Sequence, residues 1–368
     1  MPRVLRFFCF TVFLLTVFGC HFASTDETGT TLKPQKRSDG WQVSSLADKN
    51  FDTNLLMNMM EAIEKGKYVG ISSVLIAKNN ELVFEAYPGK FGINDIHSTR
   101  SASKSITSVL VGIAIDKGYL SSEHEKVLPM FPEYEGKIAA WSEQKLDISL
   151  HHLLSMTSGV KGNESAMYHS DDWIKFFFDQ PLVNTPGRAF SYATSGAVVL
   201  GNVITRGSKK RIPEFSNTYL FEPLGITEYK WPITNSLGSQ GLAMTGGGLQ
   251  LRPRDMLKIG QLYLNNGTWN GQQVVSKRWI EKSVYPHSVS DLYGEGYGYL
   301  WRIIERKING KPLISYEAWG NGGQFIMVFP ELELVTVFTG ENYGKFPETE
   351  QPFELLDKFI LPVFLKGK

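Results

Sequence analysis

A serine and a lysine three residues apart are the residues of this sequence whose types and spacing most directly suggest a reaction. Ser101 and Lys104 precede apolar residues at positions 106, 109, 110 and 113, a spacing that predicts a helix ending near Gly118. Residues three apart project from the same side of a helix, so the Lys104 amine would meet the Ser101 hydroxyl. The pair is a candidate nucleophile and general base.

The predicted position of Ser101, at or just before a helix N-terminus, suits this chemistry. Unpaired N–H groups and a partial positive charge at that end stabilise the oxyanion formed when an alkoxide attacks a carbonyl. The pattern alone is weak, because Ser142 and Lys145 repeat it and because a capping serine beside a solvated lysine has the same spacing. Other motifs must therefore support the pair.

The composition is that of a globular protein without a charge bias. The chain has 368 residues, of which 42% are hydrophobic, and 38 basic residues stand against 37 acidic ones. This balance gives no reason to expect nucleic acid or an anionic surface as a partner. Chains of this length usually divide into two lobes, and we expect two.

Residues 1–20 predict a lipoprotein signal peptide. Two arginines precede an apolar run over residues 7–18 that is too short to span a bilayer, and the run ends in Val-Phe-Gly-Cys20, which resembles a bacterial lipobox. We therefore expect a lipid anchor on Cys20 that attaches the protein to a membrane of the bacterial cell envelope, on the periplasmic or outer surface. The alternative is a soluble secreted protein, cut near Ala23. Cys9 is the only other cysteine, so the mature chain would have no disulfide.

The order of predicted elements indicates an α+β fold with one sheet built from both chain ends. Residues 21–49 are polar and predict a tether. Strands are expected at 71–77, 81–87, 298–304, 324–329 and 334–338, and helices at 51–63, 101–117, 150–159, 173–178, 195–206, 255–264, 279–283 and 352–363. We therefore predict an antiparallel five-stranded sheet flanked by helices (50–98 and 245–368) and an inserted, mostly helical lobe (99–244), with the site at their junction.

No cofactor is indicated. His124, His151 and His152 do not belong to a cluster at metal-ligand spacing, and we interpret them as structural histidines. The glycine-rich segment 245–249 lacks the Gly-Lys-Ser/Thr of a phosphate-binding loop. We therefore expect neither a metal nor another cofactor.

Several motifs in a fixed order resemble those of the β-lactamase-type, penicillin-recognising serine hydrolases. After Ser101-x-x-Lys104 come the segments 153–159 (LLSMTSG), 186–192 (PGRAFSY) and 319–323 (WGNGG). Within that family, the segments 171–173 (DDW) and 297–301 (YGYLW) look most like the esterase and 6-aminohexanoate-oligomer hydrolase branch. The resemblance extends from about residue 51 to the C-terminus and implies one catalytic domain over residues 50–368.

The resemblance implies roles for two further residues of the helical lobe. Tyr192 would open the second motif of the family and share one proton with Lys104, so that the two act together as base and then acid. Thr194 stands where an asparagine or serine is usual. Its hydroxyl can still form a hydrogen bond to Lys104 or to substrate.

The third motif of the family aligns with residues 318–320 (AWG) and lacks its basic residue, which argues against efficient β-lactam hydrolysis. The backbone N–H of Asn321 would join that of Ser101 in an oxyanion hole. Gly320 would let a substrate approach the backbone closely, although a simple bulge is the alternative. Trp319 and Tyr168 would line an apolar acyl pocket.

The sequence thus predicts a serine hydrolase that forms an acyl-enzyme on Ser101 and cleaves a small-molecule ester, amide or peptide. The alternative is a penicillin-binding or sensor module that acylates or binds without turnover. An α/β-hydrolase is not supported, because no Gly-x-Ser-x-Gly occurs.

Overall fold

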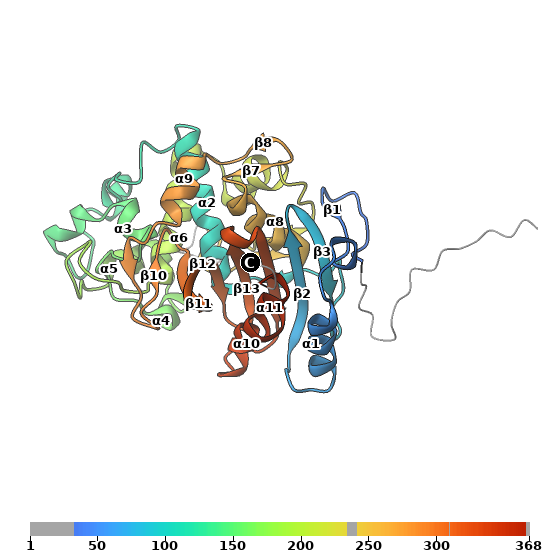
Figure 1. Ribbon diagram of the computed structural model, residues 1–368. Helices are drawn as coiled ribbons and strands as arrows, with labels where there is room; N and C mark the ends of the chain where they lie inside the picture. Colours follow the sequence, from blue (N-terminus) through green and yellow to red (C-terminus); the bar gives the residue numbers. More distant parts are fainter. Residues whose placement is uncertain (1–32, 234–240, 309, 366–368) are drawn as a thin grey trace, which may run out of the picture.

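The main sheet joins the two ends of the chain. The computed structural model describes residues 33–233, 241–308 and 310–365, and its nine-stranded sheet has the order β1-β3-β2-β14-β13-β12-β11-β10-β9. Figure 1 shows the blue strands β2 and β3 beside the red strands from the C-terminal part of the chain. The strands are β1 (Gln42–Val43), β2 (Ile71–Lys78), β3 (Glu81–Ala86), β9 (Ser288–Val289), β10 (Gly296–Tyr297), β11 (Arg302–Ile308), β12 (Lys311–Gly320), β13 (Gln324–Phe329) and β14 (Leu334–Gly340).

Helices cover both faces of this sheet, so β13 and β14 are buried along their whole length. One face, with Ile326 and Val335, packs on α2 (Ser103–Asp116) and α8 (Pro253–Leu264). The other face, with Phe325 and Met327, packs on α1 (Asn54–Glu64), α10 (Gln351–Leu355), the π-helical turn 356–360 and α11 (Leu361–Leu365). These two faces decide which strand residues can reach the end of α2.

The middle of the chain is mostly helical. Figure 1 shows α3, α5 and α6 gathered on the side of the sheet where β10 and β11 lie. These helices are α3 (Leu150–Leu154), α4 (Glu164–Tyr168), α5 (Trp173–Asp179), α6 (Thr194–Ser208) and α7 (Ile212–Ser216), and α9 (Lys277–Ser283) packs on α2. Short strands form a small sheet (β4, His97–Ser98; β5, Tyr229–Lys230; β6, Gln250–Leu251) and a hairpin (β7, Thr268–Trp269; β8, Gln272–Gln273).

The predicted α+β class is confirmed, but the predicted antiparallel five-stranded sheet is wrong. The sheet is mixed, because β1 runs parallel to β3, and it has nine strands. The longest strand that the sequence did not reveal is β12, where Ser315 and Glu317 occupy fully buried positions. Arg306 of the adjacent β11 donates to both side chains, at 2.7 and 2.6 Å, which makes their burial possible.

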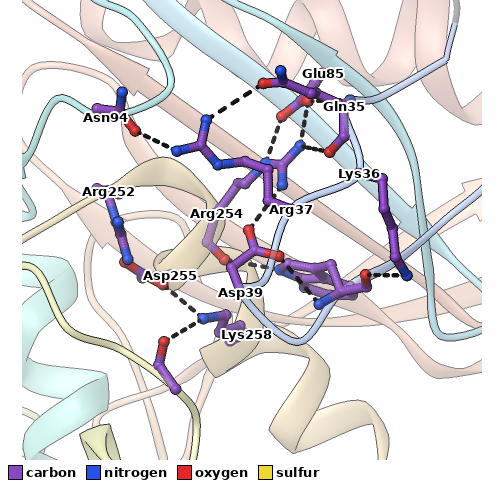
Figure 2. Close-up of polar contacts among 12 residues, drawn as sticks. Gln35, Lys36, Arg37, Asp39, Glu85, Asn94, Arg252, Arg254, Asp255 and Lys258 are labelled. Atoms are coloured by element: carbon purple, nitrogen blue, oxygen red, sulfur yellow. Dashed lines mark hydrogen bonds and ion pairs between the residues drawn. The ribbon is translucent and has the colours of Figure 1, made fainter.

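A buried arginine binds residues 35–41 to the sheet (Figure 2). Arg254 of α8 donates to Glu85 of β3 (2.8 Å), to Asp39 (2.8 Å) and to the Gln35 carbonyl (2.7 Å), and its own carbonyl accepts from the Trp41 indole. The sequence predicts a tether over 21–49. Within the described part of that range, residues 33–49 contain β1 and the buried Trp41, so the folded body includes residues before 50.

None of the helices in residues 33–233, 241–308 and 310–365 is both long and apolar enough to cross a membrane. The predicted signal peptide and Cys20 lie outside the described residues.

Arg254→Ala should lower the free energy of unfolding by about 3–5 kcal/mol, because it leaves the Glu85 carboxylate buried without its positively charged partner. Both side chains are under 5% exposed. Urea denaturation measures the loss, and Arg278→Ala, which removes an exposed arginine of α9, should change stability by less than about 0.5 kcal/mol. Equal stability of the two variants would show that the buried pair does not hold the N-terminal segment.

Candidate active site

Ser101 lies in the turn that begins the α2 helix. A 3-10 turn over Arg100–Ala102 leads directly into α2, so that Ser101 is partly exposed while Lys104 is 2% exposed. The Lys104 amine lies 3.0 Å from the Ser101 hydroxyl oxygen. This distance allows a proton to pass directly between the two groups.

The buried Lys104 amine is surrounded by neutral groups. It lies 2.6 Å from the Gly246 carbonyl oxygen and 4.9 Å from the centroid of the Tyr192 ring. Within the described ranges, no carboxylate oxygen lies within 4.0 Å of it. A neutral amine in this position can donate to Gly246 and accept the Ser101 proton at the same time.

Hydroxyl groups of α2 hold the segment that carries Gly246. Thr107 donates to the Thr245 carbonyl at 2.8 Å, and the Ser103 hydroxyl accepts from the Leu249 N–H at 3.3 Å. A Cβ on Gly246 would lie 2.7 Å from the Thr194 methyl carbon, so only glycine fits there without a shift. Sequence reasoning excluded a phosphate loop at 245–249 but missed this role of Gly246, whose functional group is a backbone carbonyl.

The segment that carries Tyr192 is held by the LLSMTSG motif. The Ser191 N–H donates to the Met156 carbonyl at 2.7 Å, and the Ala193 N–H lies 3.4 Å from the Met156 sulfur. Tyr192 is 36% exposed, and its ring faces the Lys104 amine. Among the residues the structure describes, its hydroxyl forms no hydrogen bond to Lys104 or Ser101.

Thr194 begins α6 beside Gly246 and is 4% exposed. Its hydroxyl is buried without a hydrogen-bond partner among the described residues. An unpartnered buried hydroxyl is costly, and the hydrogen bond from Thr194 to Lys104 that the sequence suggests is not formed.

The end of β12 lies against the backbone that precedes Ser101. A Cβ on Gly320 would lie 2.3 Å from the Thr99 carbonyl oxygen, so this glycine permits a close approach of two backbone segments. Asn321 follows at once, and its side-chain oxygen accepts from the Gly344 N–H at 2.8 Å. The Asn321 side chain therefore braces a turn and leaves its backbone as the group that could act in the site.

The two aromatic candidates lie in different places. Tyr168 is 49% exposed, and burial, opposed by the nearby Arg100, raises the pKa of its hydroxyl. Trp319 lies directly opposite Phe325 in the ladder and packs on Phe353, at 4.9 Å between ring centroids. Trp319 is thus on the face of the sheet away from α2, and the structure does not bring it to Ser101.

The second Ser-x-x-Lys copy forms no such pair. Lys145 is fully buried, and its amine donates to the carbonyls of Phe178 (2.5 Å) and Ala140. Burial lowers the pKa of Lys145. Its role is structural.

The described ranges contain no group of three or more histidine, cysteine, aspartate or glutamate side chains placed to hold a metal ion.

The profile of the Beta-lactamase family matches residues 57–352. The chain belongs to the Beta-lactamase family. The 6-aminohexanoate-dimer hydrolase of Paenarthrobacter ureafaciens is 25% identical over 236 residues, which are 61% of this chain and 59% of that protein. The match thus spans just over half of that relative's length.

Two solved structures share the fold of this Beta-lactamase family chain. EstCE1, a hydrolase with promiscuous acyltransferase activity, has a TM-score of 0.68 at 16% identity, over 86% of this chain and 100% of its own. The octameric penicillin-binding protein homologue from Pyrococcus abyssi has a TM-score of 0.64 at 21% identity, over 83% and 77%. The family predicted from the motifs, and the likeness to a 6-aminohexanoate-dimer hydrolase, are confirmed.

Half-buried histidines lie where α3 meets the segment 287–301. His151 Nδ1 lies 2.8 Å from the Tyr299 hydroxyl, and the ring of His287 stacks on Tyr299 at 4.2 Å. Burial is the main cause that lowers the pKa of His151, to about 4, and the nearby His287, His152 and His124 lower it further. The charge of Glu123 acts in the opposite direction. The helix α3 ends two residues before Met156, whose carbonyl binds the Ser191 N–H beside Tyr192. The contacts of these rings with α3 therefore help to position the Tyr192 segment.

Stability should fall as the pH drops from about 6.5 to about 4. The folded pKa of His151 lies below its unfolded value of 6.5, so the unfolded chain binds more protons in this window. His151→Gln should lose less Tm over that range than the wild type, although His152 and His287, whose pKa values are also lowered, keep some of the dependence. The exposed His169→Gln should follow the wild type. If all three curves coincide, His151 does not carry the acid sensitivity.

Proposed function

We propose that this protein is a serine hydrolase that cleaves an ester or amide through an acyl-enzyme on Ser101. The observation that carries the proposal is the 3.0 Å contact between the Ser101 hydroxyl and a buried Lys104 amine without a carboxylate partner in the described chain. A hydroxyl is a weak nucleophile until a base removes its proton, and Lys104 is the base within reach.

In the acylation step, Ser101 Oγ bonds to the carbonyl carbon of the substrate while its proton passes to Lys104. The backbone N–H groups of Ser101 and Asn321 bind the oxyanion, and each such donor contributes roughly 10²–10³ in rate. The bond to the leaving group then breaks, and the leaving group receives the proton from Lys104 or Tyr192. Water then attacks the carbonyl carbon of the acyl-enzyme and gives a proton to Lys104 or Tyr192. The bond from that carbon to Ser101 Oγ breaks, Ser101 takes the proton back, and the acid is released.

The substrate class is a small-molecule ester, amide or peptide. Ala318 stands where the third motif of the family would carry a basic residue, and this favours an esterase or amidase over an efficient β-lactamase. The similarity to a protein named 6-aminohexanoate-dimer hydrolase supports an amide, and the shared fold of the hydrolase EstCE1 is compatible with an ester. We further propose export and lipid attachment at Cys20, on the evidence of the N-terminal sequence alone.

Ser101→Ala should reduce hydrolysis of 4-nitrophenyl butyrate to the uncatalysed background. A fluorophosphonate should add one adduct to the wild-type peptide that contains Ser101 and should not label the variant. Intact-mass and peptide mass spectrometry measure the label. Ser142→Ala, in the second Ser-x-x-Lys copy, is the matched control and should keep full activity. Activity that survives in Ser101→Ala would reject the proposal, and one stoichiometric burst without turnover would favour the penicillin-binding or sensor alternative.

Tyr192→Phe removes the hydroxyl group and keeps the aromatic ring that faces Lys104. If the hydroxyl moves the proton, kcat should fall by roughly 10²–10⁴ while the fold is unchanged, because the ring is retained. Tyr285→Phe, at a tyrosine 64% exposed, should leave kcat unaltered. A kcat of Tyr192→Phe close to that of the wild type would show that Lys104 works without the phenol.

A further inference from the structure

Arg100 places a positive charge directly before the candidate nucleophile. Its side chain is exposed, and within the described ranges no carboxylate lies within 4.0 Å of its guanidinium group. Two acids of neighbouring segments are already engaged: Glu341, after β14, pairs with Lys90 at 3.1 Å, and Glu164, the first residue of α4, accepts from the Tyr168 hydroxyl at 3.1 Å. The charge of Arg100 is therefore available to a ligand.

Arg100 lies near residues of three other segments: the loop after β14, α4 and the end of β12. Its guanidinium carbon lies 4.5 Å from the centroid of the Tyr343 ring, which follows β14, and its charge opposes the rise in the pKa of Tyr168 on α4. A Cβ on Gly320 would lie 3.2 Å from the Arg100 Cβ, so the arginine also borders the strand end that leads to Asn321. A guanidinium group that lies over an aromatic ring keeps the N–H groups along its edge available to an anion.

The backbone of Arg100 is strained, in a conformation that does not favour an arginine. Its φ is +48°, a conformation that glycine adopts without cost and other residues rarely adopt. The preceding Thr99 holds this turn, since its N–H and its hydroxyl both donate to the Leu249 carbonyl at 2.9 Å. Glycine would adopt this conformation at lower cost, so the turn itself does not require an arginine at position 100.

We propose that Arg100 binds a free carboxylate of the substrate beside Ser101, which makes the preferred substrates esters or amides that also carry a carboxylate. The planar guanidinium donates two parallel N–H groups to the two oxygens of a carboxylate. Arg100 thus supplies a cation to a site in which Ala318 replaces the basic residue expected from the third motif. The inference rests on the proposed hydrolase function and specifies its substrate class.

The experiment compares two matched pairs of substrates, because the carboxylate could belong to the acyl part or to the leaving group. The first pair is 4-nitrophenyl hydrogen adipate and 4-nitrophenyl hexanoate, and the second is 4-carboxyphenyl hexanoate and phenyl hexanoate. Arg100→Gln should lower kcat/KM for the carboxylate member of one pair by roughly 10–100-fold and leave its neutral member within about threefold. The pair that responds identifies which part of the substrate Arg100 binds.

Two further measurements separate binding from support of the backbone. Arg100→Lys keeps the charge without the paired donors and should fall between the wild type and Arg100→Gln on the carboxylate substrate. The wild-type preference for that substrate should weaken at high salt. Arg278→Gln, which removes an exposed arginine of α9, should match the wild type on all four esters.

Equal losses on the charged and neutral members of both pairs would overturn the inference and make Arg100 a residue that supports the turn before Ser101. Unchanged kcat/KM values in Arg100→Gln would overturn it as well. In both cases hydrolysis of the neutral esters that depends on Ser101 leaves the proposed function intact. If the wild type cleaves none of the four esters and a fluorophosphonate does not label Ser101, the hydrolase proposal fails together with this inference.

Discussion

The site depends on one constraint: the Lys104 amine is buried beside the Ser101 hydroxyl and must find its hydrogen bonds among neutral groups. A buried polar group without partners costs free energy, so the surroundings of the amine cannot be arbitrary. The Gly246 carbonyl supplies one partner at 2.6 Å and the Ser101 hydroxyl lies at 3.0 Å. The start of α2 and the segment 245–249, far apart in the sequence, therefore meet at a single nitrogen atom, and the Tyr192 ring lies 4.9 Å from it.

The polar side chains of α2 explain how those segments are held. The helix is buried over most of its length, so its hydroxyl groups find partners in neighbouring segments instead of water. Thr107 and Ser103 bind the segment 245–249, and Ser105 donates to the Leu300 carbonyl at 2.5 Å. The helix that follows the candidate nucleophile is thereby fixed on two sides, by the segment 245–249 and by Leu300.

Local patterns in the sequence were enough for the elements that local forces specify. The apolar runs of β2, β13 and β14 and the periodicity of α1, α2 and α8 predicted elements close to those observed. β12 was missed because the burial of Glu317 depends on Arg306, which belongs to another strand. The folded part of residues 33–49 was missed because its packing depends on Arg254, more than 200 residues away. In the site, the Ser101 and Lys104 pair follows from helical spacing, Tyr192 came only from the family resemblance, and the Gly246 carbonyl carries no side-chain signal.

The register of β12 decides which aromatic residues can serve the site. Successive residues of a strand face opposite sides, so Gly320, which contacts the backbone at Thr99, forces the Trp319 side chain to the other face. The same strand therefore cannot supply both a close approach to the nucleophile and an aromatic wall one residue earlier. The aromatic groups beside Lys104 and Arg100 come from other elements: the Tyr192 ring faces Lys104, the Tyr343 ring lies against Arg100, and the charge of Arg100 acts on Tyr168 of α4. Because these three side chains are at least one-third exposed, they can differ in sequence while the Ser101 and Lys104 geometry is kept.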